Sequence, residues 1–567
     1  MRRFKSHSQN AEHHRRTSSR KEESGVARAL ARSAVRNGGK LRISGGAACL
    51  TMTLLAGCAV GPDFLEPAAP DVTGYTKEQL KASSASAGSG LGQGQRFAQD
   101  LDIPGQWWAT FHSRPLNDLI EDALIHNADL QTAQAALRVA YQNAEAQKGA
   151  FWPQANGNYN SFTQKVANDV SPPSSNAFSD YLTLHTVQLN VSYTPDVFGL
   201  VRREVESSEA LTALQQYQLE ATYLTLTSNV VAAAVQEASL RAQIEATKKI
   251  IRIETDLLGL LRRQQALGQV AVADVLVQEA ALAAAELLLP PLEKQLALQR
   301  DLLTALAGRY PSNEIEEKFT LASLKLPHEL PVSLPSALVE HRPDVKAAEA
   351  TLHSASAAIG VAIANRLPSV DLTATVATSA TNFALLFTPP TAAYLLMGSL
   401  TQPIFDGFSL YHKQKAAEAA YDQAEAQYRS TVITAFQNVA DSLRAIQADA
   451  RELKAAVHSE DAALKSLNIV RKQAELGQVN SLAILNAQQT YLTALLTRVQ
   501  AQASRFADTA ALFQALGGGW WNRMDVAPNV DDDRSSGCKE ILGPIISPCV
   551  PVPSAAGVSV QPQSDKS

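Results

Sequence analysis

The chain has 567 residues, of which only 6% are aromatic, so long alanine-rich helices are expected rather than a compact core of large side chains. Its formal net charge of −5 hides two unlike parts. Residues 1–42 carry 12 Lys and Arg against 3 Asp and Glu, whereas the rest of the chain carries 38 against 52. A basic head on an acidic body is typical of a targeting signal and argues against a nucleic-acid-binding protein.

The basic head ends in a predicted export signal. Arg42 is followed by the uncharged stretch 43–56, and the sequence LAGC ends at Cys58. A basic region, a short apolar region and small residues before a cleavage point are the parts of a secretory signal. LAGC also resembles a bacterial lipobox, so Cys58 is the predicted lipidation site; a buried helix with a chance cysteine is the alternative. Because such leaders rarely need about 40 residues before the apolar region, we expect the true start codon to lie downstream.

Beyond a Pro-, Ser- and Gly-rich linker the chain repeats itself. The matched segments are 129–153 with 344–368, 267–270 with 476–479, and 306–308 with 516–518. Ordered matches at nearly constant offset predict a duplicated unit of about 200 residues. The predicted parts are a leader with signal peptide at 1–57, an anchored linker at 58–106, repeats at 107–311 and 330–520, and a periplasmic tail at 521–567.

Each copy is predicted to begin with one helix of about 35 residues, at 116–150 and at 335–365, which ends before a proline. Two segments with period-two alternation follow in each copy. In residues 187–194 apolar and polar side chains take turns, as they do in 370–376. These segments are predicted strands with one apolar and one polar face.

The longest predicted helices come next, because no proline interrupts 196–289 or 404–527. Each stretch is predicted to hold a helix of about 65 residues, a turn at the sequence LGQV, and a returning helix of about 37 residues. A helix of about 100 Å must lie against other long helices. The pair Pro290-Pro291 predicts a break in the first returning helix only.

The sequence offers no catalytic or metal constellation. It has no Walker loop, no His-Glu-x-x-His and no Cys-x-x-Cys, and its 11 His residues are scattered. We therefore expect neither an enzyme nor a nucleotide-binding protein. No cofactor or metal is expected apart from a covalent lipid on Cys58.

Taken together, these features resemble the outer-membrane efflux protein family of TolC-like channels, and within it the lipid-anchored NodT-type subunits. The segments that carry the resemblance are 58–64 (CAVGPDF), 107–111 (WWATF), 342–350 (RPDVKAAEA), 485–491 (LNAQQTY) and 516–520 (LGGGW). The resemblance implies a mainly α fold with a membrane β-barrel. In such a homotrimer each protomer gives four strands to a shared 12-stranded barrel, and its long helices join an α-helical periplasmic tunnel.

The resemblance also implies a function: a passive exit duct for small molecules or drugs in the bacterial outer membrane, lipid-anchored and extending into the periplasm. Its implied partners are a periplasmic adaptor protein and an inner-membrane transporter of the RND type. Two alternatives stay open, namely the channel of a type I protein secretion system and a periplasmic coiled-coil scaffold lipoprotein without a pore. The alternating strands disfavour the scaffold.

In the family, the turns farthest from the strands meet the adaptor. The implied contact residues are Arg263, Leu267, Gly268 and Gln269 in the first copy, and Lys472, Leu476, Gly477 and Gln478 in the second. Glycine suits the left-handed conformation that reverses a helix. The alternative is that these are turn residues only.

Family channels often carry paired carboxylates after the second turn, where this chain has Ala483 and Asn486. Only Asp274 of the first copy is acidic, so Asp274 and Asn486 are the pore-constriction candidates. For Asp274 the alternative is a carboxylate that favours the start of a helix. In the tail, Cys538 and Cys549 are a possible disulfide in an oxidising periplasm, with two unpaired thiols as the alternative.

Overall fold

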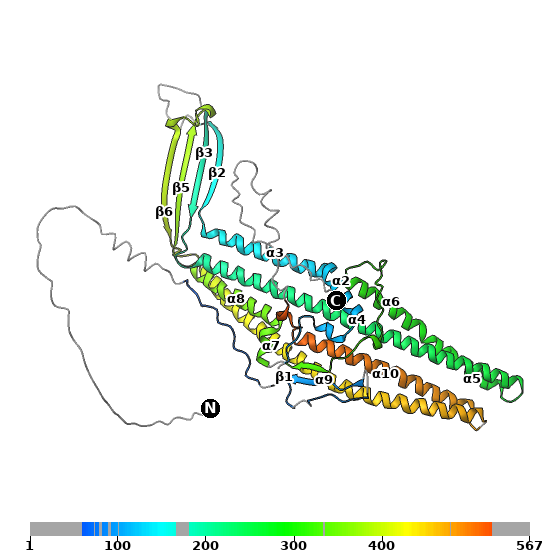
Figure 1. Cartoon of the computed structure of the whole chain (residues 1–567). Helices are drawn as coiled ribbons and strands as arrows, with labels where there is room; N and C mark the ends of the chain where they lie inside the picture. Colours follow the sequence, from blue (N-terminus) through cyan, green and yellow to red (C-terminus); the bar gives the residue numbers. More distant parts are fainter. Residues whose placement is uncertain are drawn as a thin grey trace, which may run out of the picture. The chain divides into compact units, whose positions relative to one another are not determined.

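The computed structural model describes residues 59–72, 74–78, 82–88, 92–99, 101–165, 181–332, 335–476 and 478–523 (Figure 1). The chain divides into the units Met1–Ala56 and Gly57–Ser567, and every described residue belongs to the second unit. The predicted leader and Cys58, Gly477, Cys538 and Cys549 lie outside the described residues.

The second unit contains the same order of elements twice, as predicted. The first copy consists of α2 (Arg114–His126), α3 (Ala128–Lys148), β2 (Gln154–Lys165), β3 (Tyr181–Tyr193), α4 (Leu200–Ala266), α5 (Val272–Leu287) and α6 (Leu289–Leu306). The second copy consists of α7 (Pro335–His341), α8 (Pro343–Ala364), β5 (Ser369–Ala380), β6 (Ala392–Thr401), α9 (Ser409–Glu475) and α10 (Ser481–Ala515). Two short strands, β1 (Arg96–Gln99) and β4 (Glu329–Val332), pair in parallel.

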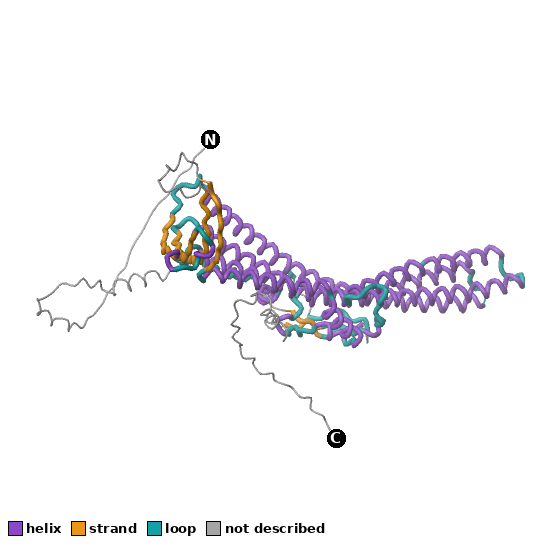
Figure 2. Tube along the Cα trace, turned by 90° about the horizontal axis from the view of Figure 1, so that it is seen from above, coloured by secondary structure: helices purple, strands orange, loops and turns teal. Residues whose placement is uncertain are grey.

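The long helices agree with the sequence-based prediction. Helices α4 and α9 each contain 67 residues, which corresponds to about 100 Å. Helix α10 is continuous, whereas Leu288 separates α5 from α6 just before Pro290, as expected. In Figures 1 and 2 the strands lie at one end of these helices and the turns that follow α4 and α9 at the other.

Among the described residues one helix, α8, is long and apolar enough to cross a membrane. Length and composition alone do not distinguish a spanning helix from a core helix. Helix α8 packs against α4 and α9, so its apolar side chains have partners within the unit.

The prediction of one unbroken helix at the start of each copy is wrong. In the first copy the side chain of Asn127 accepts hydrogen bonds from the backbone N–H groups of Asp129 (3.0 Å) and Leu130 (3.1 Å), which starts a new helix. In the second copy Arg342 has φ −79° and ψ 125°, because the following Pro343 disfavours the helical region for the residue before it. The break is therefore made by different chemistry at equivalent positions.

Both breaks also hold the end of the returning helix. Asn127 Nδ2 donates to the carbonyl oxygen of Leu306 at 3.1 Å, and Arg342 Nη1 donates to that of Ala515 at 2.8 Å. These carbonyls are among the groups that a helix leaves without an internal partner at its C-terminus. In each copy the same kind of hydrogen bond thus joins the break near its start to the end of its last helix.

The glycines that end the two returning helices show that the predicted match of 306–308 with 516–518 is wrong by one residue. Gly308 (φ +72°) and Gly517 (φ +96°) both adopt the left-handed conformation. A Cβ on Gly308 would lie 2.3 Å from the carbonyl oxygen of His126, and one on Gly517 would lie 3.0 Å from that of His341. Gly308 is therefore equivalent to Gly517 rather than to Gly518, and the last helices match at the same offset as the LGQV turns.

The four longer strands form one antiparallel sheet in the order β2-β3-β5-β6. Both hairpins have the same register, since Gly157 pairs with Leu189 and the equivalent Leu372 pairs with Gly398. Apolar side chains gather on one face of the sheet, as the alternation predicts. On the described residues, β2 and β6 each pair on one side only and leave two open edges.

The largest core lies where short segments pack against the middle of α4 and α9 and the C-terminal half of α10. Trp107 is fully buried and stacks on Phe513 with 5.4 Å between ring centroids. Trp520 Nε1 donates to the carbonyl oxygen of His341 at 2.6 Å, and Trp521 stacks on the His341 ring. The tryptophans after the last helix therefore pack its end against α7.

Candidate functional site

The tip, which we define as residues 267–271 together with the described residues 476 and 478–480, lies where the two long helices end. Gly268 has φ +74°, the left-handed value that glycine adopts without strain. Gln269 N donates to Gln264 O at 2.9 Å, and Gln478 N donates to Gln473 O at 2.8 Å. The two turns therefore share one hydrogen-bonding pattern at an offset of 209 residues, as the repeated sequence predicts.

Large apolar side chains stand in solvent at both turns. Leu267 is 73% exposed and Leu476 is 71% exposed. Arg263 and Lys472 lie in the last turns of α4 and α9, where a cation is favourable at a helix C-terminus. Each hairpin therefore ends in an exposed leucine near a basic residue, and a contact with another protein at this place stays a prediction.

The two pore-constriction candidates differ in their surroundings. Asp274 accepts a hydrogen bond from Ala271 N at 3.3 Å at the start of α5, which is the role of a carboxylate at a helix start. Asn486 is exposed in the second turn of α10. The residue that caps α10 is Asn480, whose side chain accepts from Ala483 N at 3.1 Å. A pore-lining role for Asp274 and Asn486 stays a prediction.

A buried polar node joins the two hairpins near the tip, and the sequence did not reveal it. The node consists of Glu254 on α4, Gln278 on α5 and Gln488 on α10, all buried. Gln278 Nε2 donates to the carboxylate of Glu254 and, at 3.3 Å, to its backbone oxygen. Gln488, with its amide nitrogen turned toward Glu254, donates to the same carboxylate at 3.2 Å. Burial raises the pKa of Glu254, against the opposing effect of the Gln278 hydrogen bond.

The node fixes how the hairpins lie against each other. Glu254 stands 12 residues before the end of α4, which corresponds to roughly 18 Å from the tip. A polar residue in an otherwise apolar helix interface specifies register, because any sliding leaves it without partners. Movement of the tip must therefore break or carry along these hydrogen bonds.

A second buried carboxylate lies on α9. Asp449 is 8% exposed, and its carboxyl group is within hydrogen-bonding reach of Asp508. Arg505 is buried beside them, and its Nη2 donates to Gln93 O (2.9 Å) and Gln95 Oε1 (3.1 Å). Burial, followed by the neighbouring Asp508, raises the pKa of Asp449 to about 7.

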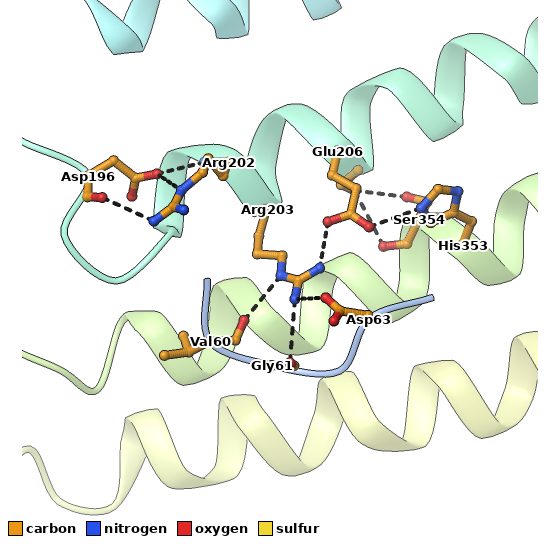
Figure 3. Close-up of polar contacts among 10 residues, drawn as sticks. Val60, Gly61, Asp63, Asp196, Arg202, Arg203, Glu206, His353 and Ser354 are labelled. Atoms are coloured by element: carbon orange, nitrogen blue, oxygen red, sulfur yellow. Dashed lines mark hydrogen bonds and ion pairs between the residues drawn. The ribbon is translucent and has the colours of Figure 1, made fainter. Parts of the chain in front are cut away.

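The residues that follow the predicted lipidation site are held against the body of the protein. We call residues 59–64 the post-cysteine segment (Figure 3). Arg203 Nε donates to Val60 O at 3.1 Å, and its Nη2 donates to Gly61 O at 3.4 Å and to Asp63 Oδ1 at 2.8 Å. One buried guanidinium on α4 thus binds three residues of this segment.

A second layer supports this arginine. Arg203 Nη1 donates to Glu206 Oε2 at 2.7 Å, and His353 Nε2 lies 3.0 Å from Glu206 Oε1. Phe64 stacks on His353 with 4.3 Å between ring centroids. Sequence reasoning missed these contacts because Arg203 and its partners in the segment are about 140 residues apart and share no local pattern.

Comparison with known proteins agrees with this architecture. The family model described as outer membrane efflux protein matches residues 119–309 and 334–518. The probable efflux pump outer membrane protein TtgC of Pseudomonas putida is 25% identical over 480 residues, which are 84% of this chain and 96% of that protein. The pyoverdine export outer membrane protein OpmQ of Pseudomonas aeruginosa is 29% identical over 439 residues, 76% of this chain and 90% of that protein. The solved CmeC outer membrane channel of Campylobacter jejuni has the same fold, with a TM-score of 0.75 at 21% identity over 84% of this chain and 98% of that chain.

Proposed function

The chain belongs to the outer membrane efflux protein family, and we propose that it forms, as a homotrimer, the passive exit duct of a tripartite efflux system. It is an outer-membrane protein whose long helices extend into the periplasm. Small molecules enter the duct from an inner-membrane transporter of the RND type, to which a periplasmic adaptor connects it. The transporter supplies the energy, so the duct itself needs no catalytic group.

The open sheet is the observation that carries the proposal. Its order β2-β3-β5-β6 leaves β2 and β6 as edges. Unpaired N–H and C=O groups at an edge are costly in lipid, so only closed barrels of strands cross a membrane. Three four-stranded sheets joined β2 to β6 close a barrel of twelve strands, which lies within the known range for outer-membrane barrels.

The other sites take complementary roles in this arrangement. The tip offers exposed Leu267 and Leu476 to the adaptor. A lipid on Cys58 tethers the N-terminus to the outer membrane as a second attachment besides the barrel. Small-molecule efflux is favoured over protein export because the relatives compared above are named for an efflux pump and for pyoverdine export.

Cysteines placed on the two edges are expected to link three protomers covalently. Asn158→Cys on β2 is combined in turn with Ala393→Cys, Leu395→Cys and Met397→Cys on β6, in a background with serine at the native tail cysteines. Asn158 and these β6 residues lie on the same face of the sheet. At the correct register, Cβ atoms across neighbouring strands are close enough for a disulfide. Non-reducing electrophoresis should then show a covalent trimer.

A pair that includes a central strand is the matched control. Gln188→Cys on β3 with Leu395→Cys on β6 should give monomer, since each strand beside β3 is already paired within the chain. Cross-linked dimers without trimer, or no cross-link in any of the three edge pairs, would contradict the trimeric barrel.

A further inference from the structure

We propose that the body of the protein contains a binding site for its own lipidated N-terminus. The site has two parts: a seat for the post-cysteine segment on α4 and α8, and an acyl-chain groove at the adjoining end of the sheet. The inference rests on the lipidation of Cys58 that the proposed function includes. The duplicated fold supplies an internal comparison, because only the first part of the chain has such a segment to bind.

The start of α4 is the first place where the two copies differ. Gly199 precedes α4 with φ +82°, and the equivalent Phe408 precedes α9 with φ +67°. The turn itself therefore accepts a side chain. A Cβ on Gly199, however, would lie 2.6 Å from Cα and Cβ of Ala59. The glycine is required by the post-cysteine segment and not by the turn.

Helix α8 differs from α3 in the same way. Gly360 stands inside α8, where glycine is unfavourable, whereas the equivalent residue of α3 is Glu145. A Cβ on Gly360 would lie 2.9 Å from Val60 O, and a Cβ on Gly61 would lie 2.4 Å from the Cα of Gly360. Two backbones thus meet at a distance that only a pair of glycines permits.

Arg203 is the third difference. Its side chain is only 5% exposed and binds Val60, Gly61 and Asp63, whereas the equivalent His412 of α9 is exposed. These three positions, at each of which one copy departs from the other, all contact the post-cysteine segment. A chain end that lay on the surface without specific binding would not require glycine at positions 199 and 360 or a buried arginine at position 203.

The groove lies on the apolar face of the sheet at the end nearest the helices. It has a volume of about 400 Å³. Gly398, which stands where the first hairpin has Leu189, is one of its lining residues. The side chains that line it on this face come from Val191, Tyr193, Leu372, Ala374 and Leu396.

The seat holds the residues after Cys58 close enough to the groove for acyl chains on Cys58 to reach it. Val60 N donates to Phe198 O at 3.0 Å, and Phe198 follows Tyr193 of the groove by five residues, which span at most about 17 Å. Acyl chains that fill one leaflet reach about 15 Å, half of the hydrocarbon thickness. The chemical class of the ligand is therefore the acyl chains of a lipidated cysteine. A single acyl chain in bulk lipid gives only marginal binding, so a fixed seat adds to the attachment.

Photo-cross-linking of the full-length trimer in outer-membrane vesicles tests the proposal. Benzoylphenylalanine is placed at Leu396 in the groove, at Leu395 on the opposite face, or at Val187 farther along the same face. Mass spectrometry should find the lipidated Cys58 peptide joined to the Leu396 position at least tenfold more often than to the other two. Adding Arg203→Ala should abolish this preference, whereas His412→Ala, the equivalent change in the second copy, should preserve it. Gly398→Leu, which fills the groove, should also remove it.

Several results would overturn the inference: adducts at position 396 with free phospholipid only, equal yields at all three positions, or an unchanged preference in the Arg203→Ala variant. An intact mass without lipid on Cys58 would do so as well. Failure of the exit-duct function is distinguishable, because the same variants are assayed for single-channel conductance. Conductance that persists while Arg203→Ala loses the cross-link is the result that supports the seat, whereas an unsubstituted trimer that shows the cross-link but no conductance would refute the duct alone.

Discussion

Replacing Gly268 by proline is expected to abolish assembly with the periplasmic adaptor while leaving the trimer intact. Gly268 has φ +74°, which proline cannot adopt, and its N–H donates to Gln265 O at 2.9 Å, which proline cannot do. Leu267→Asp should have the same effect, because it puts a charge where an exposed leucine meets its partner. Loss of such a contact costs about 2 kcal/mol or more, a weakening of roughly 30-fold.

In-cell cross-linking from the tip to the adaptor measures this effect, with native electrophoresis as the check on the trimer. Gly268→Asn is the matched control, since asparagine tolerates the left-handed conformation and keeps the N–H group. No atom lies within 4 Å of a Cβ at this position, so the control has room for its side chain. Normal cross-linking of the Gly268→Pro and Leu267→Asp variants would refute a docking role for the tip.

Replacing Asp449 by asparagine is expected to stabilise the protein at pH 8 and to change little at pH 4. Burial raises the pKa of Asp449 from 3.8 to about 7, so the folded protein favours the protonated carboxyl group. The contribution of this group to stability is full below its unfolded pKa of about 4, falls steadily as the pH rises above that value, and is lost once the pH has passed about 7. Asparagine keeps the neutral form at every pH. The expected gain at pH 8 is on the order of 2–4 kcal/mol.

Thermal unfolding of the purified protein at both pH values measures the difference. Asp441→Asn, at an exposed aspartate of the same helix, is the control and should show no such dependence. A midpoint that responds equally to both substitutions at pH 8 would show that Asp449 does not carry the effect. The groups that face Asp449 are Asp508, Glu452 and Arg505, so its titration includes their influence.

The elements of the fold follow from the sequence because their signals are local. Period-two alternation identified the strands, the absence of proline identified the long helices, and the LGQV turns fixed the tip. The breaks at Asn127 and Arg342 were missed, although Pro343 was visible, because a helical pattern continues on both sides of each break. What holds them is a carbonyl group at the far end of the copy, about 175 residues away, which no local pattern records.

The candidate sites likewise divide into those with a local sequence signal and those that depend on contacts between distant residues. The tip residues were found because a glycine turn between two long helices is a local feature. Glu254 was not, since a carboxylate every few residues is ordinary on a long helix and only packing shows that this one is buried. Arg203 was missed because its partner Asp63 is 140 residues away in the sequence. Strands β2 and β3 lie between the two residues in the chain.

The central claim is that three copies of this chain enclose a pore. The most direct test is the single-channel conductance of the purified trimer in a planar lipid bilayer. A closed barrel with a periplasmic tunnel predicts discrete conductance steps of uniform size, with frequent transitions where the helix ends at the tip change their packing. Insertion of the trimer without any conductance, at every voltage and pH applied, would contradict the exit duct and favour a scaffold lipoprotein without a pore.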